Sequence, residues 1–126
     1  MRVGVVDLVE GDWESGFASP YASDRYREIV PATVLRALGH DVQLVPIAKW
    51  DASYDKGARP DVVVVAKLFR RGEADFDELA QRVLQGVAAA RAIGIKVVAD
   101  YCDNLFNADT GAYWRALCGA VDHCVA

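Results

Sequence analysis

Five short runs of β-branched and other apolar residues occur along the chain, separated by polar or helix-patterned segments. The runs span residues 2–8, 42–45, 61–66, 95–99 and 121–126. Runs of this length and composition predict strands, and the unbroken valines at 62–65 are typical of a parallel strand buried on both faces. Long polar loops are predicted at 9–22 and 46–60, and loops of such length in a compact domain are usually functional.

Three helices are predicted between these strands. Apolar residues fall on one helical face in residues 29–38 and recur at helical spacing in residues 76–90. A shorter helix carrying Tyr113 and Leu117 is predicted to begin after Asp109 or Thr110, either of which can cap it.

The ends of the first two helices have recognisable signals. Ser23 or Asp24 can cap the first helix. Pro31 then implies either a kink or an irregular segment before it that leaves Pro31 in the first helical turn. Gly39 and Gly94 are predicted to end the two helices, because glycine adopts the left-handed conformation that other residues resist.

This alternation predicts one α/β domain with a parallel sheet of about five strands and helices on both faces. A length of 126 residues also favours one domain. We expect the strand order 3-2-1-4-5, with the switch point between the first and fourth strands. Three strands and two helices are expected to supply the core residues Val3, Val5, Val34, Leu38, Val63, Val65, Leu79, Val83, Val97 and Val98.

Composition and charge exclude some classes of function. The chain is 53% hydrophobic and 25% charged, as expected of a globular protein, and its net charge of −4 argues against nucleic acid as a partner. Cys102, Cys118 and Cys124 form no C-x-x-C pair, which argues against a disulfide framework and favours a reducing cytoplasm. The cysteines are expected to be small buried hydrophobic residues, and no metal site is expected.

Common ligand-binding motifs are absent. No G-x-G-x-x-G follows the first strand, and the second ends in Val45-Pro46 without an acid to hold a ribose, so no dinucleotide site is expected. No P-loop motif is present either. A phospho-receiver domain requires an aspartate where the third strand is instead followed by Lys67, and a corrinoid site would require a D-x-H-x-x-G loop.

Polar residues cluster where the fourth strand ends. Asp100, Asp103 and Asn104 lie there, at the sheet edge where open α/β sheets bind ligands. A carboxylate in this place can orient or deprotonate a hydroxyl group, which makes Asp100 a candidate catalytic residue. The alternative is that all three residues form a turn.

Two basic groups accompany this edge. Arg25 and Arg27 begin the first helix, where positive charge opposes the helix dipole and calls for an anionic partner. Arg25 is the candidate for a phosphate or aspartate partner, and Arg27 is expected to be solvated. Lys67, Arg70 and Arg71 follow the third strand and are expected to be solvated, with contact to a ligand phosphate as the alternative.

Two segments together resemble a known enzyme family. The first reads S-x-R-Y-R-x-x-x-P from residue 23 and continues as L-G-H-x-V from residue 38. The second reads V-V-A-D-x-C-D-N-x-F from residue 97, followed by Y-x-R-A-L-C from residue 113 and A-x-D from residue 120. This pattern resembles the N-terminal half of bacterial GT-B glycosyltransferases, in particular the large retaining group 1 or family 4-like enzymes. The likeness covers the whole chain, and D-x-C-D-N-x-F is its most specific part.

The resemblance implies a Rossmann-like domain that binds the sugar acceptor. It implies that Gly16, Ser23 and Arg25 bind substrate together with Asp103 and Asn104, and that Asp100 lies near the acceptor hydroxyl. Many relatives have a glycine pair after the first strand and a histidine after the fourth. This chain has only Gly11 and Gly16 in that loop, and it has Asp100 and Asp103 near the histidine position.

The resemblance also implies partners. The acceptor is expected to be a glycan, a lipid or another cell-surface molecule, which extends the expected location from the cytoplasm to the inner face of the membrane. The nucleotide-sugar donor is expected to bind a C-terminal domain outside this chain, so no cofactor is expected here. Loop aromatic residues could stack on a sugar ring or pack on the rim of the sheet: Trp13, Tyr21 and Trp50.

The chain stops within its last apolar run. We therefore expect a fragment, and the resemblance implies that it is the N-terminal half of a longer two-domain enzyme that transfers no sugar alone. The open edge of the last strand is expected to favour self-association. The alternative function is a stand-alone flavodoxin-like binding or regulatory module without catalysis.

Overall fold

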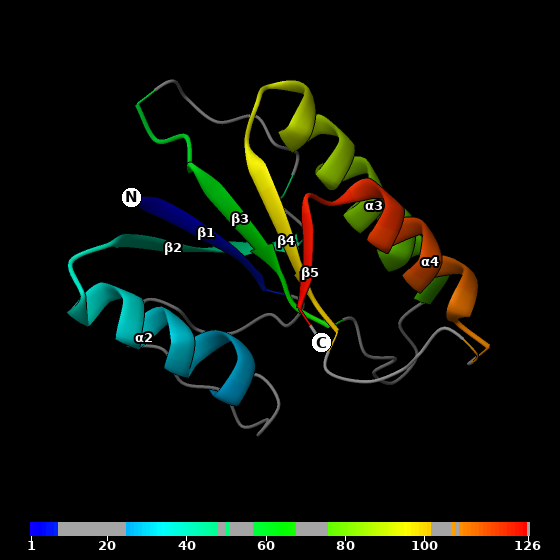
Figure 1. Ribbon diagram of the computed structural model, residues 1–126, viewed down its shortest axis with the longest axis horizontal. Coiled ribbons are helices and arrows are strands. Elements are labelled where there is room, and N and C mark those ends of the chain that lie inside the picture. Colours follow the sequence, from blue (N-terminus) through cyan, green and yellow to red (C-terminus); the bar gives the residue numbers. More distant parts are fainter. Residues whose placement is uncertain are drawn as a thin grey trace.

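The computed structural model describes residues 1–7, 25–47, 50, 57–67, 76–101, 107 and 109–125. In this part of the chain, five parallel strands form a single sheet (Figure 1). The strands are β1 (Arg2–Asp7), β2 (Asp41–Pro46), β3 (Val62–Val65), β4 (Lys96–Asp100) and β5 (His123–Val125). The predicted α/β class with a parallel sheet is confirmed.

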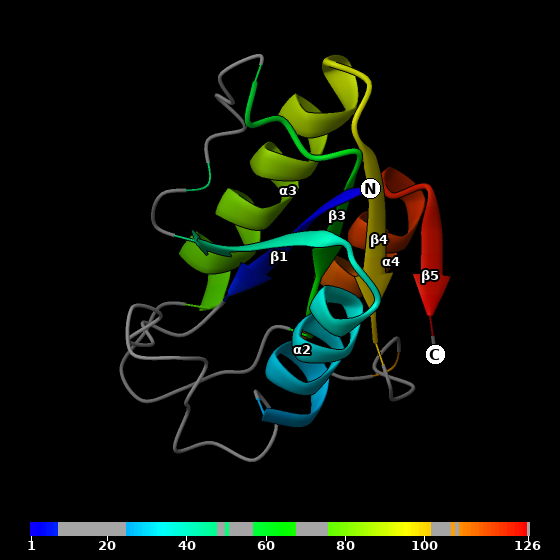
Figure 2. The ribbon, with the colours of Figure 1, turned by 90° about the vertical axis from the view of Figure 1, so that its left-hand side faces the viewer.

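Helices cover both faces of the sheet, as predicted. Figures 1 and 2 show α2 on one face, with α3 and α4 on the opposite face. The helical elements are a π-helical turn η1 (Arg25–Ile29), α2 (Val30–Ala37), α3 (Phe76–Ala92) and α4 (Gly111–Ala120). This arrangement follows from the right-handed connections, because α2 leads outward to β2 whereas α3 and α4 lead in the opposite direction across the sheet.

The predicted strand order is wrong in one respect. The observed order is β2-β1-β3-β4-β5, so β3 lies between β1 and β4 instead of outside β2, and the switch point lies between β1 and β3. The physical reason is visible in the sequences of β2 and β3. The all-valine β3 can be buried on both faces only at an inner position, whereas β2 alternates polar and apolar residues, as suits an edge strand.

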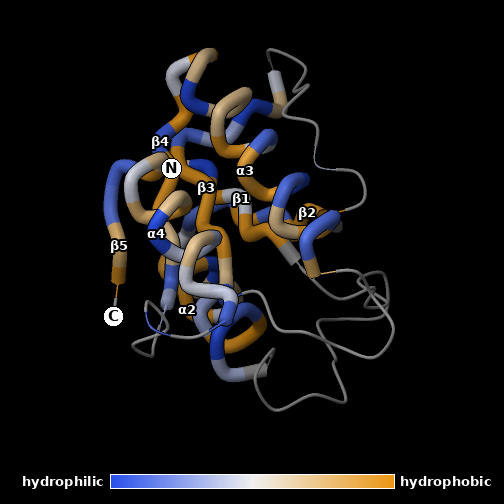
Figure 3. The backbone as a smooth tube through the Cα atoms, turned by 90° about the vertical axis from the view of Figure 1, so that its right-hand side faces the viewer, coloured by the Kyte–Doolittle hydropathy of each residue, from blue (hydrophilic) through white to orange (hydrophobic). Residues whose placement is uncertain are grey.

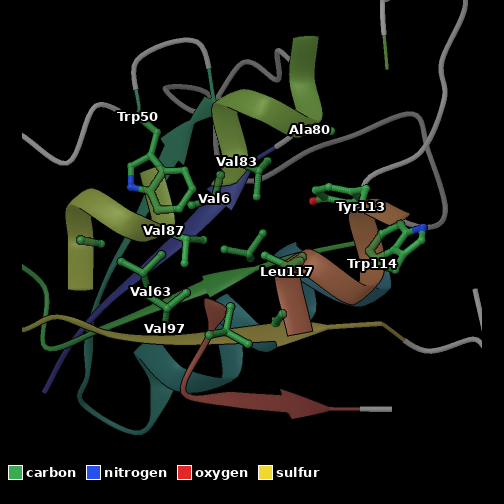
Figure 4. Packing of buried hydrophobic residues seen from close by; sticks show 14 of the residues in the cluster. Val6, Trp50, Val63, Ala80, Val83, Val87, Val97, Tyr113, Trp114 and Leu117 are labelled. Carbon is green, nitrogen blue, oxygen red and sulfur yellow. The ribbon is translucent and has the colours of Figure 1, made fainter. Parts of the chain in front are cut away.

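Two apolar clusters lie on the two faces of the sheet. The larger one joins β3 and β4 to α3 and α4, and the labelled side chains in Figure 4 interlock there. The smaller one joins Val3, Val5 and Val42 to Ala32 of α2. Figure 3 shows the hydrophobic colour concentrated along the inner strands. Six predicted core residues are buried: Val3, Val5, Val63, Val65, Val83 and Val97.

The buried face of α2 differs from the prediction. Val34 and Leu38 are 51% and 69% exposed, so they do not belong to the core. The helix instead turns Ile29 and Ala32 toward the sheet. The periodicity predicted an amphipathic helix but the wrong buried face. The face with Ala32 is buried because this small residue lets the helix approach the strands more closely than a bulky residue would. Leu79 and Val98, also expected in the core, are half-buried.

Pro31 lies in the first turn of α2, after the π-helical turn. Of the two alternatives for this segment, the irregular start is therefore the one observed. Gly39 and Gly94 have φ angles of +88° and +81°, so both predicted glycine stops are confirmed. Thr110 precedes α4 but makes no capping hydrogen bond, and its hydroxyl oxygen accepts one from Trp114 Nε1 at 3.0 Å instead.

Aromatic side chains form much of the larger cluster. Trp50, which could have faced a sugar, is 6% exposed and packs against Gly86 of α3 (Figure 4). Trp114 contacts Tyr101 and Tyr113 edge to face, with ring centroids 5.4 and 4.7 Å apart. For Trp50, packing on the sheet rim is thus the observed role. Trp13 and Tyr21 lie outside the described residues.

Asp122 fastens the start of β5 to β4. Its backbone N–H donates to the Val97 carbonyl, and its carboxylate accepts a bond from the Val97 N–H, both at 2.9 Å. Arg91 and Lys96 lie 3.6 and 3.5 Å from the same carboxylate. The hydrogen bond from Val97, aided by these two cations, holds the pKa of Asp122 below its usual range although burial opposes the shift.

We expect Asp122→Ala to lower the midpoint of thermal unfolding by several degrees at pH 7. Because the folded-state pKa is depressed, the contribution of this carboxylate is fully present above the unfolded-state pKa, about 3.9, and is lost as the pH falls through the lower folded value. The difference in unfolding midpoint between wild type and variant, followed by circular dichroism, should therefore narrow below pH 4. Glu78→Ala removes an exposed ion pair with Arg82 and is the matched control, expected to change little. A gap that is independent of pH would contradict the assignment.

Candidate functional site

Asp100 ends β4 at the carboxyl edge of the sheet. Val97 and Ala99 belong to the cluster beneath α3 and α4, so strand alternation turns Asp100 toward the face that α2 covers. There Asp100 Oδ2 lies 3.6 Å from Arg27 Nη1. The structure therefore joins the start of the first helix to the end of the fourth strand, two segments that are far apart in the sequence.

The Arg27–Asp100 pair is partly shielded from water. The two side chains are 22% and 23% exposed, so the expectation that Arg27 is a solvated charge is wrong. Arg27 Nη1 is buried and has no hydrogen-bond partner among the described residues, because 3.6 Å is too long for a direct bond. A small movement of either side chain, or an acceptor group beside the guanidinium, would satisfy this donor.

Two further charged residues belong to this end of the molecule. Lys67 lies two residues after the end of β3 and is only 9% exposed, so its expected solvated state is wrong. Glu28 is 3% exposed and follows Arg27 in η1. Charged side chains are rarely buried unless they are paired. What the sequence does indicate is that Lys67 lies beside a strand end and Glu28 beside a helix start. Burial itself was not predictable from that pattern.

The other predicted site residues cannot be compared in this way. Gly16, Ser23, Asp103 and Asn104 lie outside the described residues, and so do Arg70 and Arg71. Arg25 begins η1, but its side chain is not among those described. Of the predicted site, the structure thus describes the side chain of Asp100, and it adds Arg27, Glu28 and Lys67.

A polar pocket of about 390 Å³ lies at the opposite edge of the sheet. Its lining comes from the amino-terminal ends of the strands and from two turns: Arg2, Arg59, Pro60, Asp61 and Gly94. Asp61 accepts a hydrogen bond from the Arg2 backbone N–H at 2.8 Å, and the Arg2 side chain pairs with Asp41 at 3.5 Å. Arg2 and Asp61 thus have partners within the chain, and the pocket lies at the edge of the sheet opposite Asp100.

The described ranges contain neither a cluster of metal ligands nor a membrane-spanning helix. No group of three or more His, Cys, Asp or Glu side chains there could hold a metal ion. None of the helices described is both long and apolar enough to cross a bilayer. The candidate site consists of the charged residues at the carboxyl edge, where a carboxylate lies beside a guanidinium that could hold an anion.

The fold and this edge define the class of protein as an α/β domain with a doubly wound parallel sheet and a charged carboxyl edge. Comparison of the chain with protein-family models, with curated proteins and with solved structures finds no match.

Proposed function

We propose that the chain is the acceptor-binding half of a nucleotide-sugar-dependent glycosyltransferase. In this proposal, Asp100 orients or deprotonates the acceptor hydroxyl, and an arginine at the start of the first helix holds an anionic group of the acceptor. The acceptor is a glycan, a lipid or another cell-surface molecule. The donor binds a second domain, so that sugar transfer takes place between the two.

The observation that carries the proposal is the Arg27–Asp100 pair. Both residues come from the segments that resemble GT-B glycosyltransferases, and their charged groups lie 3.6 Å apart. A carboxylate can hold a hydroxyl group, and a guanidinium beside it can hold an anion. This pair supplies both groups, and one guanidinium nitrogen of Arg27 is buried without a hydrogen-bond partner among the described residues. Because its guanidinium lies beside Asp100, Arg27 is proposed as an anion-binding residue in addition to Arg25.

The strand order is compatible with this proposal. A doubly wound sheet of order 3-2-1-4-5-6 becomes β2-β1-β3-β4-β5 when its third strand is omitted and the remaining strands are renumbered. The long connection between β2 and β3 lies where that strand would stand in the sequence. Asp100 ends β4, which lies two strands from β1 and on the same side of the switch point as β3.

The test uses the longest natural reading frame that contains this chain, assayed with a panel of UDP- and GDP-sugars. Asp100→Asn should lower turnover about 100-fold, a typical loss for a general base, while the unfolding midpoint stays near that of the wild type. Arg27→Gln should raise the KM for an anionic acceptor more than it lowers kcat. Asp109→Asn, an exposed carboxylate, is the matched control and should leave both parameters unchanged. Wild-type turnover by Asp100→Asn would overturn the catalytic role.

One observation favours the alternative function, a flavodoxin-like binding or regulatory module. The order β2-β1-β3-β4-β5 is that of flavodoxin-like sheets, whose ligands also bind at the carboxyl edge. This alternative predicts a natural protein that consists of this domain alone and releases no nucleotide from any sugar donor. A reading frame of several hundred residues with donor turnover would exclude it.

A further inference from the structure

Two cysteines meet at the junction of α4 and β5. Cys118 lies near the end of α4 and is half-buried, whereas Cys124 lies on β5 and is exposed. Their Sγ atoms are 3.0 Å apart, only about 1 Å more than a covalent S–S bond. The expectation that the cysteines are buried is therefore wrong for this pair.

The fold itself brings these two sulfurs together. Asp122 fixes the start of β5 against Val97, and the parallel register then places Cys124 beside Ala99 of β4. Ala99 belongs to the cluster covered by α3 and α4, so Cys124 faces the same side of the sheet as α4. Figure 1 shows α4 leading directly into β5. Backbone hydrogen bonds thus hold the pair in place.

We propose that Cys118 and Cys124 form a redox-active dithiol that a low-molecular-weight disulfide converts reversibly to an intramolecular disulfide. The exposed Cys124 thiolate attacks one sulfur of the small disulfide, which forms a mixed disulfide and releases one thiolate. The Cys118 thiolate then attacks Sγ of Cys124, which closes the protein disulfide and releases the second thiolate. The protein loses two electrons and two protons, and the small disulfide becomes two thiols.

The surroundings favour a pair that stays reduced until such an oxidant is present. Burial, together with the bond to Cys118, raises the pKa of Cys124 above its usual range although the contact with Tyr101 opposes the shift. The titratable neighbour of Cys124 is Tyr101, which directly follows β4. Its hydroxyl oxygen lies 3.8 Å from Cys124 Sγ, and burial raises the pKa of Tyr101. In a reducing compartment, a disulfide formed here would be a transient switch, since lasting cytosolic disulfides are rare.

The switch would act beside the carboxyl edge of the sheet. Tyr101 directly follows Asp100, and its backbone N–H donates to the Val125 carbonyl at 2.8 Å. Linking Cys124 to Cys118 fixes β5 to α4 around this residue. The inference stands on the cysteine geometry alone and does not depend on the proposed glycosyltransferase function.

The experiment exposes the folded chain to oxidised glutathione and follows the cysteines by mass spectrometry. No Lys or Arg lies between Cys118 and Cys124, and Arg115 separates them from Cys102, so trypsin leaves the pair in one peptide apart from the third thiol. That peptide should lose two hydrogens and carry no glutathione, and dithiothreitol should restore both thiols.

Two serine variants test the order of the steps. Cys118→Ser should stop at the mixed disulfide, with one glutathione retained on Cys124. Cys124→Ser should leave the less accessible Cys118 largely as a thiol. Circular dichroism checks that each variant is folded, and a Cys102→Ser chain should behave as the wild type does. Three results with the wild-type chain would overturn the proposal. These are an unreacted peptide, glutathione that stays on either cysteine, and a disulfide between two chains.

Discussion

Replacing Trp114 by alanine is expected to lower the free energy of unfolding by about 3–5 kcal/mol, the usual loss for a fully buried tryptophan. Trp114 is 1% exposed, packs against two tyrosine rings, and donates a hydrogen bond from Nε1 to the Thr110 hydroxyl. Alanine would leave a cavity beneath α4 and remove that bond. Because domains of this size are stable by only about 5–15 kcal/mol, the variant should be close to unfolding at 37 °C. Urea denaturation followed by circular dichroism measures the loss.

Two variants in the same helix separate packing from helix propensity. Trp114→Phe keeps an aromatic ring and should lose less than the alanine variant. Ala116→Ser changes an exposed position of α4 and should shift the free energy by less than about 0.5 kcal/mol. A loss below about 1 kcal/mol for Trp114→Ala would show that the aromatic cluster does not stabilise the fold.

The second large effect is expected from Gly86→Ala in α3. A Cβ atom at this position would lie 2.5 Å from Cε3 and 2.7 Å from Cζ3 of the Trp50 ring. Real side chains do not approach so closely, so the ring or the helix must move. We expect a loss of about 1–3 kcal/mol from this overpacking, although alanine is the better helix former.

Gly119→Ala is the matched control. Gly119 lies in α4, and a Cβ atom there would meet nothing within 4 Å. Alanine at this position should stabilise the protein by up to about 1 kcal/mol through helix propensity. The two substitutions are chemically identical and should have opposite signs in the same urea experiment. Trp50→Leu should remove most of the Gly86→Ala penalty in the double variant. Stabilisation by Gly86→Ala alone would refute the close contact.

The sequence predicted the elements of this fold much better than their arrangement. Alternation of apolar runs and helical segments was sufficient for strand and helix assignment, because hydrogen bonding and burial leave few ways to satisfy such patterns. Strand order depends on long-range packing, and the helix-poor connection between β2 and β3 gave no direct indication of it. The all-valine β3 did carry the relevant signal, since only an inner strand can bury both faces.

The candidate site was predictable in part. Asp100 follows a strand, and strand ends converge on one edge, so its place could be expected. That Arg27 lies beside it depends on the π-helical turn before Pro31, because one residue more or less in that turn changes which side chain faces the sheet. The burial of Lys67 depends on β3 being an inner strand, which was missed together with the strand order.

The position of β1 inside the sheet sets a constraint on how the protein matures on the ribosome. β1 is made before its two hydrogen-bonded neighbours, β2 and β3, which end at residues 46 and 65. At a synthesis rate of about 5–20 residues per second, Val65 is added roughly 3–12 s after Asp7, the last residue of β1. For that interval the nascent chain presents an apolar strand with open edges. The ladder on both sides of β1 is therefore completed only when β3 has also emerged.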